Sequence, residues 1–215
     1  MDHWSQQVRA HWGISSNLRQ LDGEYDLNFL AEGENGTGYI VKVMRPDCED
    51  WLVDMQVQAM DHIEKLDPSL PCPKVIPSTS GHSYLSVSDE RGIKRLVWVI
   101  ERLSGKCYAR SAPKTDALIS EFGQILGRTT AALKTFDHPN LARDFKWNLS
   151  QADWIGPKLD CITDPARRSL LTDIHSKFTL VKPVLDGLET QAIHNDANDY
   201  NILVDGPLGA PQVSG

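Results

Sequence analysis

Apolar and polar residues follow one another differently in the first hundred residues and in the rest of the chain. Early on, short runs rich in β-branched and aromatic residues, such as GYIVKVM at 38–44 and KRLVWVIERL at 94–103, lie between turn-forming segments. Runs of this kind are typical of strands. Residues 3–12 and 49–66 differ, because their apolar residues recur every three or four positions, as in amphipathic helices. The first part is therefore predicted to be strand-rich, with a short helix and one long helix.

Helical spacing dominates the later part of the chain. A Thr-Asp start followed by periodic apolar residues predicts a helix over 115–136. Residues 164–188 predict a second helix, which Pro183 is expected to break. The aromatic and polar segment 137–157 follows neither period and is predicted to be irregular.

The order of these elements predicts an α+β fold with two lobes. A strand-rich N-terminal lobe would span residues 1–103 and a helical C-terminal lobe residues 104–215, with a hinge near 101–106. Trp147 and Trp154 are expected to pack in a core, although they are also suited to line a substrate pocket.

Composition narrows the class of protein. The 215 residues are 40% hydrophobic and 24% charged, as in a folded domain. A net charge of −7 argues against binding to a nucleic-acid backbone. The N-terminus carries no apolar signal segment, and no run is apolar enough to span a membrane. The four cysteines are widely spaced, which favours free thiols in a cytoplasmic protein over a zinc or redox site.

Candidate chemistry concentrates in residues 192–206, AIHNDANDYNILVDG. Asp196 is suited to accept a proton from a hydroxyl group, and the side-chain oxygen of Asn201 is a ligand for a hard cation such as Mg²⁺. The pair suits phosphoryl transfer. A plain Asx-rich turn before a strand is the simpler alternative. A metal-dependent hydrolase that also uses His194 is a further alternative, but it needs more ligands than this segment supplies.

Lys42 is the second candidate, because β-branched residues flank it on a predicted strand. It is either an outward-facing lysine on a half-exposed sheet or a cation directed at nucleotide phosphates.

These segments, in this order, resemble the aminoglycoside phosphotransferase and choline kinase superfamily, whose fold is similar to that of protein kinases. IHNDANDYNILVD at 193–205 is similar to its catalytic loop, GEYDLNFLA at 23–31 to its nucleotide-covering loop, and GYIVKVM to its lysine-bearing strand. LVWVIERLSGK at 96–106 resembles its fifth strand and hinge. FDHPNLARDFKWNL at 136–149, taken with the catalytic loop, is most similar to the hydroxylysine kinase-like branch, whose bacterial members are often fused to an aminotransferase domain.

The resemblance implies roles for individual residues. Asp196 matches the catalytic base, Asn201 the residue that holds Mg²⁺, and Lys42 the phosphate-binding lysine. His194 matches a structural histidine, expected to be buried and hydrogen-bonded.

It also implies a site for the nucleotide, ATP or GTP. The backbone of the loop from Gly23 to Leu27 would cover the phosphates, and hinge backbone groups from Glu101 to Leu103 would meet the adenine. Glu101 is equally readable as an ordinary charge at a strand end.

Two departures from the family pattern stand out. The family glutamate that pairs with the strand lysine falls here on Gln56, which leaves Asp54, Glu49 or Glu64 as substitutes unless Lys42 is held in another way. The metal-binding Asp-Phe-Gly segment that follows the catalytic loop in the family is not in the sequence, so we expect the chain to be an incomplete and inactive fragment.

The sequence therefore predicts a small-molecule kinase. The intact enzyme would move the γ-phosphate of ATP or GTP to a hydroxyl group of a small, amine-bearing substrate, with Mg²⁺. The alternative is a kinase-like module that binds a nucleotide or a partner without chemistry, which Gln56 favours.

Overall fold

The structure, a computed structural model, describes residues 2–33, 37–206 and 212–214. The chain divides into two compact units, one formed by Met1–His138 with Ala192–Gly215 and the other by Pro139–Gln191. The predicted lobe boundary between residues 103 and 104 stays a prediction.

Helices and strands follow one another largely as the periodicity predicted. The helices are α1 (His3–Trp12), α2 (Asp50–Leu66), α3 (Asp116–Leu133) and α4 (Pro165–Asp186), with 3-10 helices η2 (Tyr108–Arg110) and η3 (Leu149–Cys161). The strands are β1 (Arg19–Leu21), β2 (Leu27–Glu32), β3 (Gly38–Val43), β4 (Val75–Ile76), β5 (Tyr84–Ser88), β6 (Lys94–Glu101), β7 (Lys106–Cys107), β8 (Leu203–Asp205) and β9 (Gln212–Val213). None of the helices in the described part of the chain combines the length and apolarity needed to cross a bilayer.

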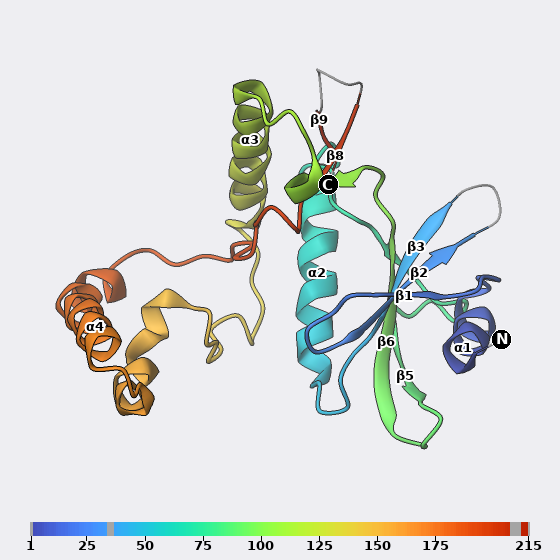
Figure 1. Cartoon of the computed structure of the whole chain (residues 1–215). Coiled ribbons are helices and arrows are strands. Elements are labelled where there is room, and N and C mark those ends of the chain that lie inside the picture. Colours follow the sequence, from blue (N-terminus) through green and yellow to red (C-terminus); the bar gives the residue numbers. More distant parts are fainter. Residues whose placement is uncertain (1, 34–36, 207–211, 215) are drawn as a thin grey trace. The chain divides into compact units, whose positions relative to one another are not determined.

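The main sheet has six antiparallel strands in the order β1-β2-β3-β6-β4, with β5 also paired to β6. It lies between α1 on one face and α2 on the other (Figure 1). The α1 face is apolar, and its fully buried residues include Val8, Val41, Val97 and Val99. Helix α2 covers the other face with Val53 and Val57, which pack on β-strand residues such as Trp98.

The ends of the helices are set by local chemistry. The side chain of Asp2 accepts a hydrogen bond from Ser5 N at 2.7 Å and begins α1, which ends at Gly13 with a φ of 69°. Thr115 caps α3 in the same way, at 3.2 Å from Leu118 N. The Thr-Asp start of that helix was therefore a reliable signal.

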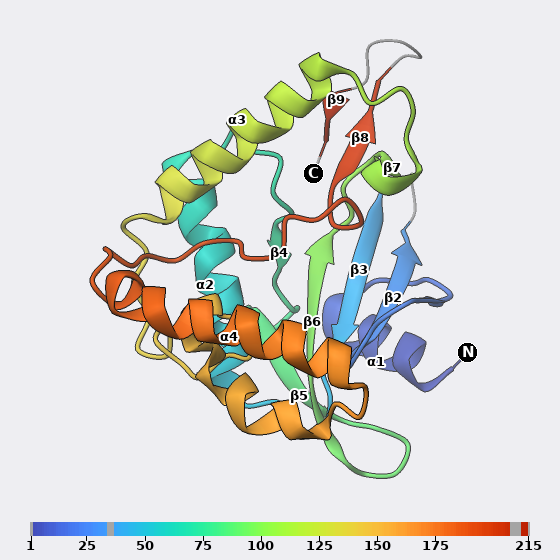
Figure 2. The same ribbon diagram turned by 60° about the vertical axis from the view of Figure 1, so that its left-hand side comes forward.

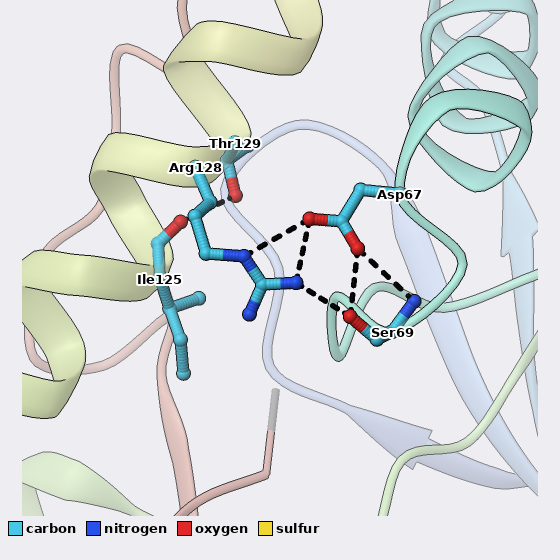
Figure 3. A network of polar contacts seen from close by, with 5 residues as sticks. All are labelled: Asp67, Ser69, Ile125, Arg128 and Thr129. Atoms are coloured by element: carbon cyan, nitrogen blue, oxygen red, sulfur yellow. Dashed lines mark hydrogen bonds and ion pairs between the residues drawn. The ribbon is translucent and has the colours of Figure 1, made fainter.

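Helix α3 is joined to the end of α2 by a polar network (Figure 3). Arg128 donates from Nε to Asp67 Oδ2 at 2.9 Å, and its Nη2 contacts the same oxygen at 2.5 Å and Ser69 Oγ at 2.5 Å. Hydrogen bonds from Ser69 and Arg128 lower the pKa of Asp67. The forked guanidinium thus ties α3 to the residue that ends α2.

A second, three-stranded sheet of order β7-β8-β9 carries the end of the candidate segment 192–206 (Figure 2). Gly105 precedes β7 with a φ of 114°, and a Cβ on it would lie 2.9 Å from Val204 O. Ser104 Oγ donates to Asp205 Oδ2 at 3.2 Å. The polypeptide that leaves β6 therefore packs directly on β8.

The helices of the unit Pro139–Gln191 differ from those predicted. The segment predicted to be irregular contains part of η3, and α4 continues through Pro183 to its end at Asp186. Lys182 holds the last turns of α4 to η3, since its Nζ contacts Asp153 Oδ2 at 3.2 Å and Ser150 O at 2.9 Å. These contacts stabilise the turn that the proline weakens.

The two tryptophans of this unit are also placed differently from expectation. Trp147 is 71% exposed and Trp154 45% exposed, so neither packs in a core. The four cysteines are free thiols, and Cys161 is the one that is exposed.

Candidate active site

The segment before β8 forms a tight polar loop in which Asn195 has a φ of 65°. Asparagine tolerates this left-handed conformation better than most residues. Asp196 N donates to His194 Nδ1 at 3.3 Å, so the histidine acts within the loop as an acceptor. His194 is hydrogen-bonded as expected, but it is exposed rather than buried. The backbone turn at Asn195 brings Asp196 and the amides that follow it together.

Two side-chain amides orient the Asp196 carboxylate. Asn198 Nδ2 donates to Asp196 Oδ1 at 2.7 Å, and Asn201 Nδ2 donates to Asp196 Oδ2 at 2.7 Å and to Asp196 O at 2.9 Å. Each carboxylate oxygen has a second lone pair, so the exposed group retains capacity to accept from a substrate hydroxyl. Asn198 was missed in the sequence, although asparagine is a common first residue of an Asx turn, and its Oδ1 does accept from Tyr200 N at 2.8 Å.

The same contacts define what Asn201 offers to a cation. Its nitrogen faces two acceptors, which directs Oδ1 away from Asp196, and the described part of the chain records no hydrogen bond to that oxygen. Among the described residues, no group of three His, Cys, Asp or Glu side chains is placed to hold a metal. Asn201 Oδ1 is a hard oxygen ligand of the kind that Mg²⁺ binds together with nucleotide phosphates.

The segment that begins at β7 makes backbone contacts with the loop that carries Asp196. Tyr108 N donates to Ile202 O at 2.8 Å and Ala109 N to Asp199 O at 2.7 Å. Cys107 Sγ lies 3.3 Å from Asp199 O. Backbone contacts thus fix the loop relative to the polypeptide that leaves β6.

In the hinge, the predicted adenine contacts are only partly available. Glu101 N already donates to Lys74 O at 2.8 Å, and Arg102 N to Gly38 O at 3.0 Å. For Leu103, the described residues include no backbone hydrogen-bond partner. Among the three predicted contacts, Leu103 is therefore the residue whose N–H has no acceptor in the described part of the chain.

Lys42 lies on the α2 face of the main sheet, where β3 pairs with β6. Its Nζ stands 5.5 Å from the centroid of the Trp98 ring, a cation–π geometry. Burial lowers the pKa of Lys42, and the charge of Asp26 opposes this shift. The described residues include no ion pair to Lys42, and none of its recorded contacts is with the loop that carries Asp196.

The residues considered as carboxylate partners of Lys42 are engaged elsewhere. Asp54 Oδ2 lies 3.3 Å from His138 Nε2, Glu64 Oε1 lies 2.7 Å from Lys74 Nζ, and Glu49 accepts from the Trp51 indole. The amide of Gln56 donates to a backbone carbonyl of its own helix. Lys42 is therefore held without an acidic partner from α2.

The predicted phosphate-covering loop is closely packed. A Cβ on Gly23 would lie 2.5 Å from Asp26 O and 2.7 Å from Asn28 Nδ2, distances that real side chains do not occupy. Asp26 Oδ1 in turn accepts a hydrogen bond from Arg45 N at 2.7 Å, which anchors the loop to the residues that follow β3. A glycine is therefore required at position 23 for the loop to close over Asn28.

Comparison with known proteins gives this geometry a context. A sequence model described as the phosphotransferase enzyme family matches residues 17–215. The hydroxylysine kinase of Danio rerio is 24% identical over 213 residues, which cover 93% of this chain and 59% of that protein. The chain thus spans somewhat more than half the length of this relative.

Solved structures show the same fold. An aminopropanol kinase associated with a microcompartment superposes with a TM-score of 0.73 at 19% identity, over 98% of this chain and 66% of that one. An amicoumacin kinase, solved with AMP-PNP, Ca²⁺ and Ami, superposes with a TM-score of 0.67 at 15% identity, over 95% of this chain and 61% of that one. The protein-kinase-like α+β fold predicted from the sequence is confirmed.

Proposed function

Because the chain belongs to the phosphotransferase enzyme family, we propose that it transfers the γ-phosphate of ATP or GTP to a hydroxyl group of a small, amine-bearing molecule. The observation that carries the proposal is the Asp196 carboxylate, fixed by two amide donors and exposed at the end of a loop. The hydroxylysine kinase and aminopropanol kinase named above support an amino alcohol as the acceptor. The proposal concerns the full-length gene product.

In this mechanism, Asp196 accepts a hydrogen bond from the acceptor hydroxyl and orients it, then takes its proton as the oxygen attacks the γ-phosphorus. The bond from the γ-phosphorus to the bridging oxygen breaks, and ADP or GDP leaves with that oxygen. Lys42 holds the nucleotide phosphates from the α2 face of the sheet. The loop at Gly23 covers them with backbone groups, and Leu103 meets the base.

Asn201 Oδ1 would hold Mg²⁺ together with the phosphates. The ion would supply neutralisation of the phosphate charge. Asn201 has a second task that needs no metal, because its amide nitrogen keeps the Asp196 carboxylate in place.

The test is transfer of phosphate to a panel of amino alcohols, with ATP or GTP and Mg²⁺. Product formation is followed by ³¹P NMR for the wild type, Asp196→Asn and Asp199→Asn. We expect Asp196→Asn to lower the transfer rate by about 10²–10⁴-fold, the usual contribution of a general base. Asp199→Asn is the matched control, because its carboxylate has no recorded role in the loop and only its backbone oxygen is used. Full transfer by Asp196→Asn would contradict the assignment.

A nucleotide-binding module without chemistry is the second candidate, favoured because no carboxylate of α2 pairs with Lys42. Affinity for AMP-PNP with and without Mg²⁺ separates the two functions. An AMP-PNP affinity that is the same with and without Mg²⁺, with no transfer to any acceptor, supports the module. Binding that strengthens with Mg²⁺, together with transfer, supports the kinase.

A further inference from the structure

The buried ammonium group of Lys42 has no hydrogen-bond acceptor in the described part of the chain. Its ammonium group is largely removed from water, and a buried charge without a hydrogen-bond acceptor is unfavourable. Of the neighbouring carboxylates, Asp26 acts on it at a distance, and those of α2 are bound to other groups. The ring of Trp98 covers one side of the amine and offers only its π face.

Asn28 has the opposite deficiency, a buried hydrogen-bond acceptor without a donor. Its Oδ1 is fully buried, and the described part of the chain offers it no hydrogen-bond donor. Leaving such an acceptor unsatisfied costs about 1–3 kcal/mol. Its nitrogen lies against Gly23, so packing of the phosphate-covering loop determines where the amide stands.

The sheet brings these two groups together. Asn28 on β2 is directly opposite Lys42 on β3, which is directly opposite Trp98 on β6. Residues paired in this way project from the same face, with Cβ atoms about 4.5–5.5 Å apart. Asn28 and Trp98 therefore flank Lys42 on its two sides.

We propose that Asn28 is a positioning residue for Lys42, whose Nζ donates a hydrogen bond to Asn28 Oδ1 when it engages the nucleotide phosphates. The pairing replaces the carboxylate that α2 does not offer, and it rests on the phosphate-binding role proposed above for Lys42. Lysine is only a donor and has three hydrogens, so one bond to Asn28 leaves two for phosphate oxygens.

A neutral partner has a consequence that a carboxylate does not. The amide dipole stabilises the ammonium form but does not neutralise it, so the full positive charge remains for the phosphates. Because the amide nitrogen rests on Gly23, closure of the loop over the nucleotide and placement of the lysine depend on the same side chain.

The test is a double-mutant cycle on AMP-PNP affinity, measured by calorimetry on the gene product. Asn28→Leu keeps the size of the side chain and removes the acceptor. We expect it to weaken AMP-PNP binding about tenfold, as for the loss of a hydrogen bond to a charged group. In the Lys42→Met background the same substitution should have no further effect. Equal weakening in both backgrounds would show a merely structural role and overturn the proposal.

A second measurement needs no nucleotide, because the amide dipole of Asn28, or a charge placed at that position, acts on the neighbouring Lys42 amine across the strand pair before the hydrogen bond forms. The pKa of Lys42 is followed by NMR of ¹³Cε-labelled lysine in the wild type, Asn28→Leu, Asn28→Asp and Gln20→Leu, the last being a control on exposed strand β1. Asn28→Asp should raise the pKa and Asn28→Leu should lower it, with Asp26 unchanged in all variants.

The two measurements separate the possible failures. A Lys42 pKa that moves in neither variant of Asn28 overturns the pairing, whatever the function of the protein. A pKa that moves in both, in a protein that does not bind AMP-PNP, supports the pairing and contradicts the proposed function.

Discussion

Val41 and Lys42 are neighbours on β3, and they point to opposite faces of the main sheet. Val41 is fully buried against α1, among valines and aromatic residues. Lys42 lies on the α2 side between Asn28 and Trp98, with a lowered pKa and, among the residues that the structure describes, no acidic partner. The α1 face consists of apolar side chains that stabilise the fold. The α2 face keeps polar groups, at some cost in stability, at the place where we propose that a nucleotide binds.

The largest effect is expected from a charge on the α1 face. Val97 is fully buried there, and Val97→Asp would place a carboxylate without a partner among apolar side chains. We expect the free energy of unfolding to fall by at least about 4 kcal/mol, a large part of the stability of a domain. Urea denaturation measures it. The control is Ser86→Asp at an exposed position of the same sheet, which should change stability little. A folded, stable Val97→Asp protein would contradict this account of the α1 face.

The opposite outcome is expected for Lys42→Met. AMP-PNP affinity should fall at least tenfold, because the variant lacks the buried cation that we propose to bind the phosphates. The free energy of unfolding should stay the same or rise, since the methionine fits the apolar surroundings without the burial of a charge. Calorimetry and urea denaturation measure the two quantities. Lys94→Met, at an exposed position on β6, should leave both unchanged.

The same variant also tests the pKa of Lys42. Burial lowers this pKa below its ordinary value of 10.5. Between the lowered value and 10.5, the unfolded chain binds more protons than the folded one, so the free energy of unfolding rises with pH in that window. Subtraction of the Lys42→Met curve from the wild-type curve isolates this rise. A flat difference would mean that the amine is not desolvated.

Much of this contrast could be predicted from the sequence, because it depends on local periodicity. The β-branched neighbours of Lys42 predicted its strand, and the spacing in residues 49–66 predicted α2. The HNDANDYN segment identified Asp196 and Asn201, which the loop does bring into contact. The predicted roles of these residues stay predictions.

What the sequence did not predict depends on contacts between distant segments. The pairing of Asn28 with Lys42 follows from the register of β2 on β3, which alternation alone does not determine. The prediction that Pro183 breaks the helix was wrong, because Lys182 holds that turn through contacts outside its helix. The engagement of Asp54 by His138 joins residues far apart in the chain and leaves no local signal.

A smaller effect is expected at the edge of the α2 face. Gly23→Ala would force the loop away from Asp26 O and Asn28, so stability should fall by about 1–3 kcal/mol and AMP-PNP affinity should decrease. Gly123→Ala in α3 is the matched control, because a Cβ there meets nothing within 4 Å and alanine favours the helix. Denaturation should therefore show changes of opposite sign in the two variants. The same sign in both would contradict the close packing of the loop.

The smallest effect concerns the outer layer on the α2 side, where Arg128 joins α3 to Asp67. Ser69 and Arg128 lower the pKa of Asp67 below its ordinary 3.8, so the contact adds stability above that pH and loses it as the pH falls through the lowered value. The pair is exposed, which limits its strength. Asp67→Asn should lower Tm slightly at neutral pH and match the wild type in acid, whereas Asp61→Asn, with no recorded polar contact in the described part of the chain, should follow the wild type throughout. A constant difference in Tm at every pH would show that Asp67 acts through its helix-ending geometry and not through its charge.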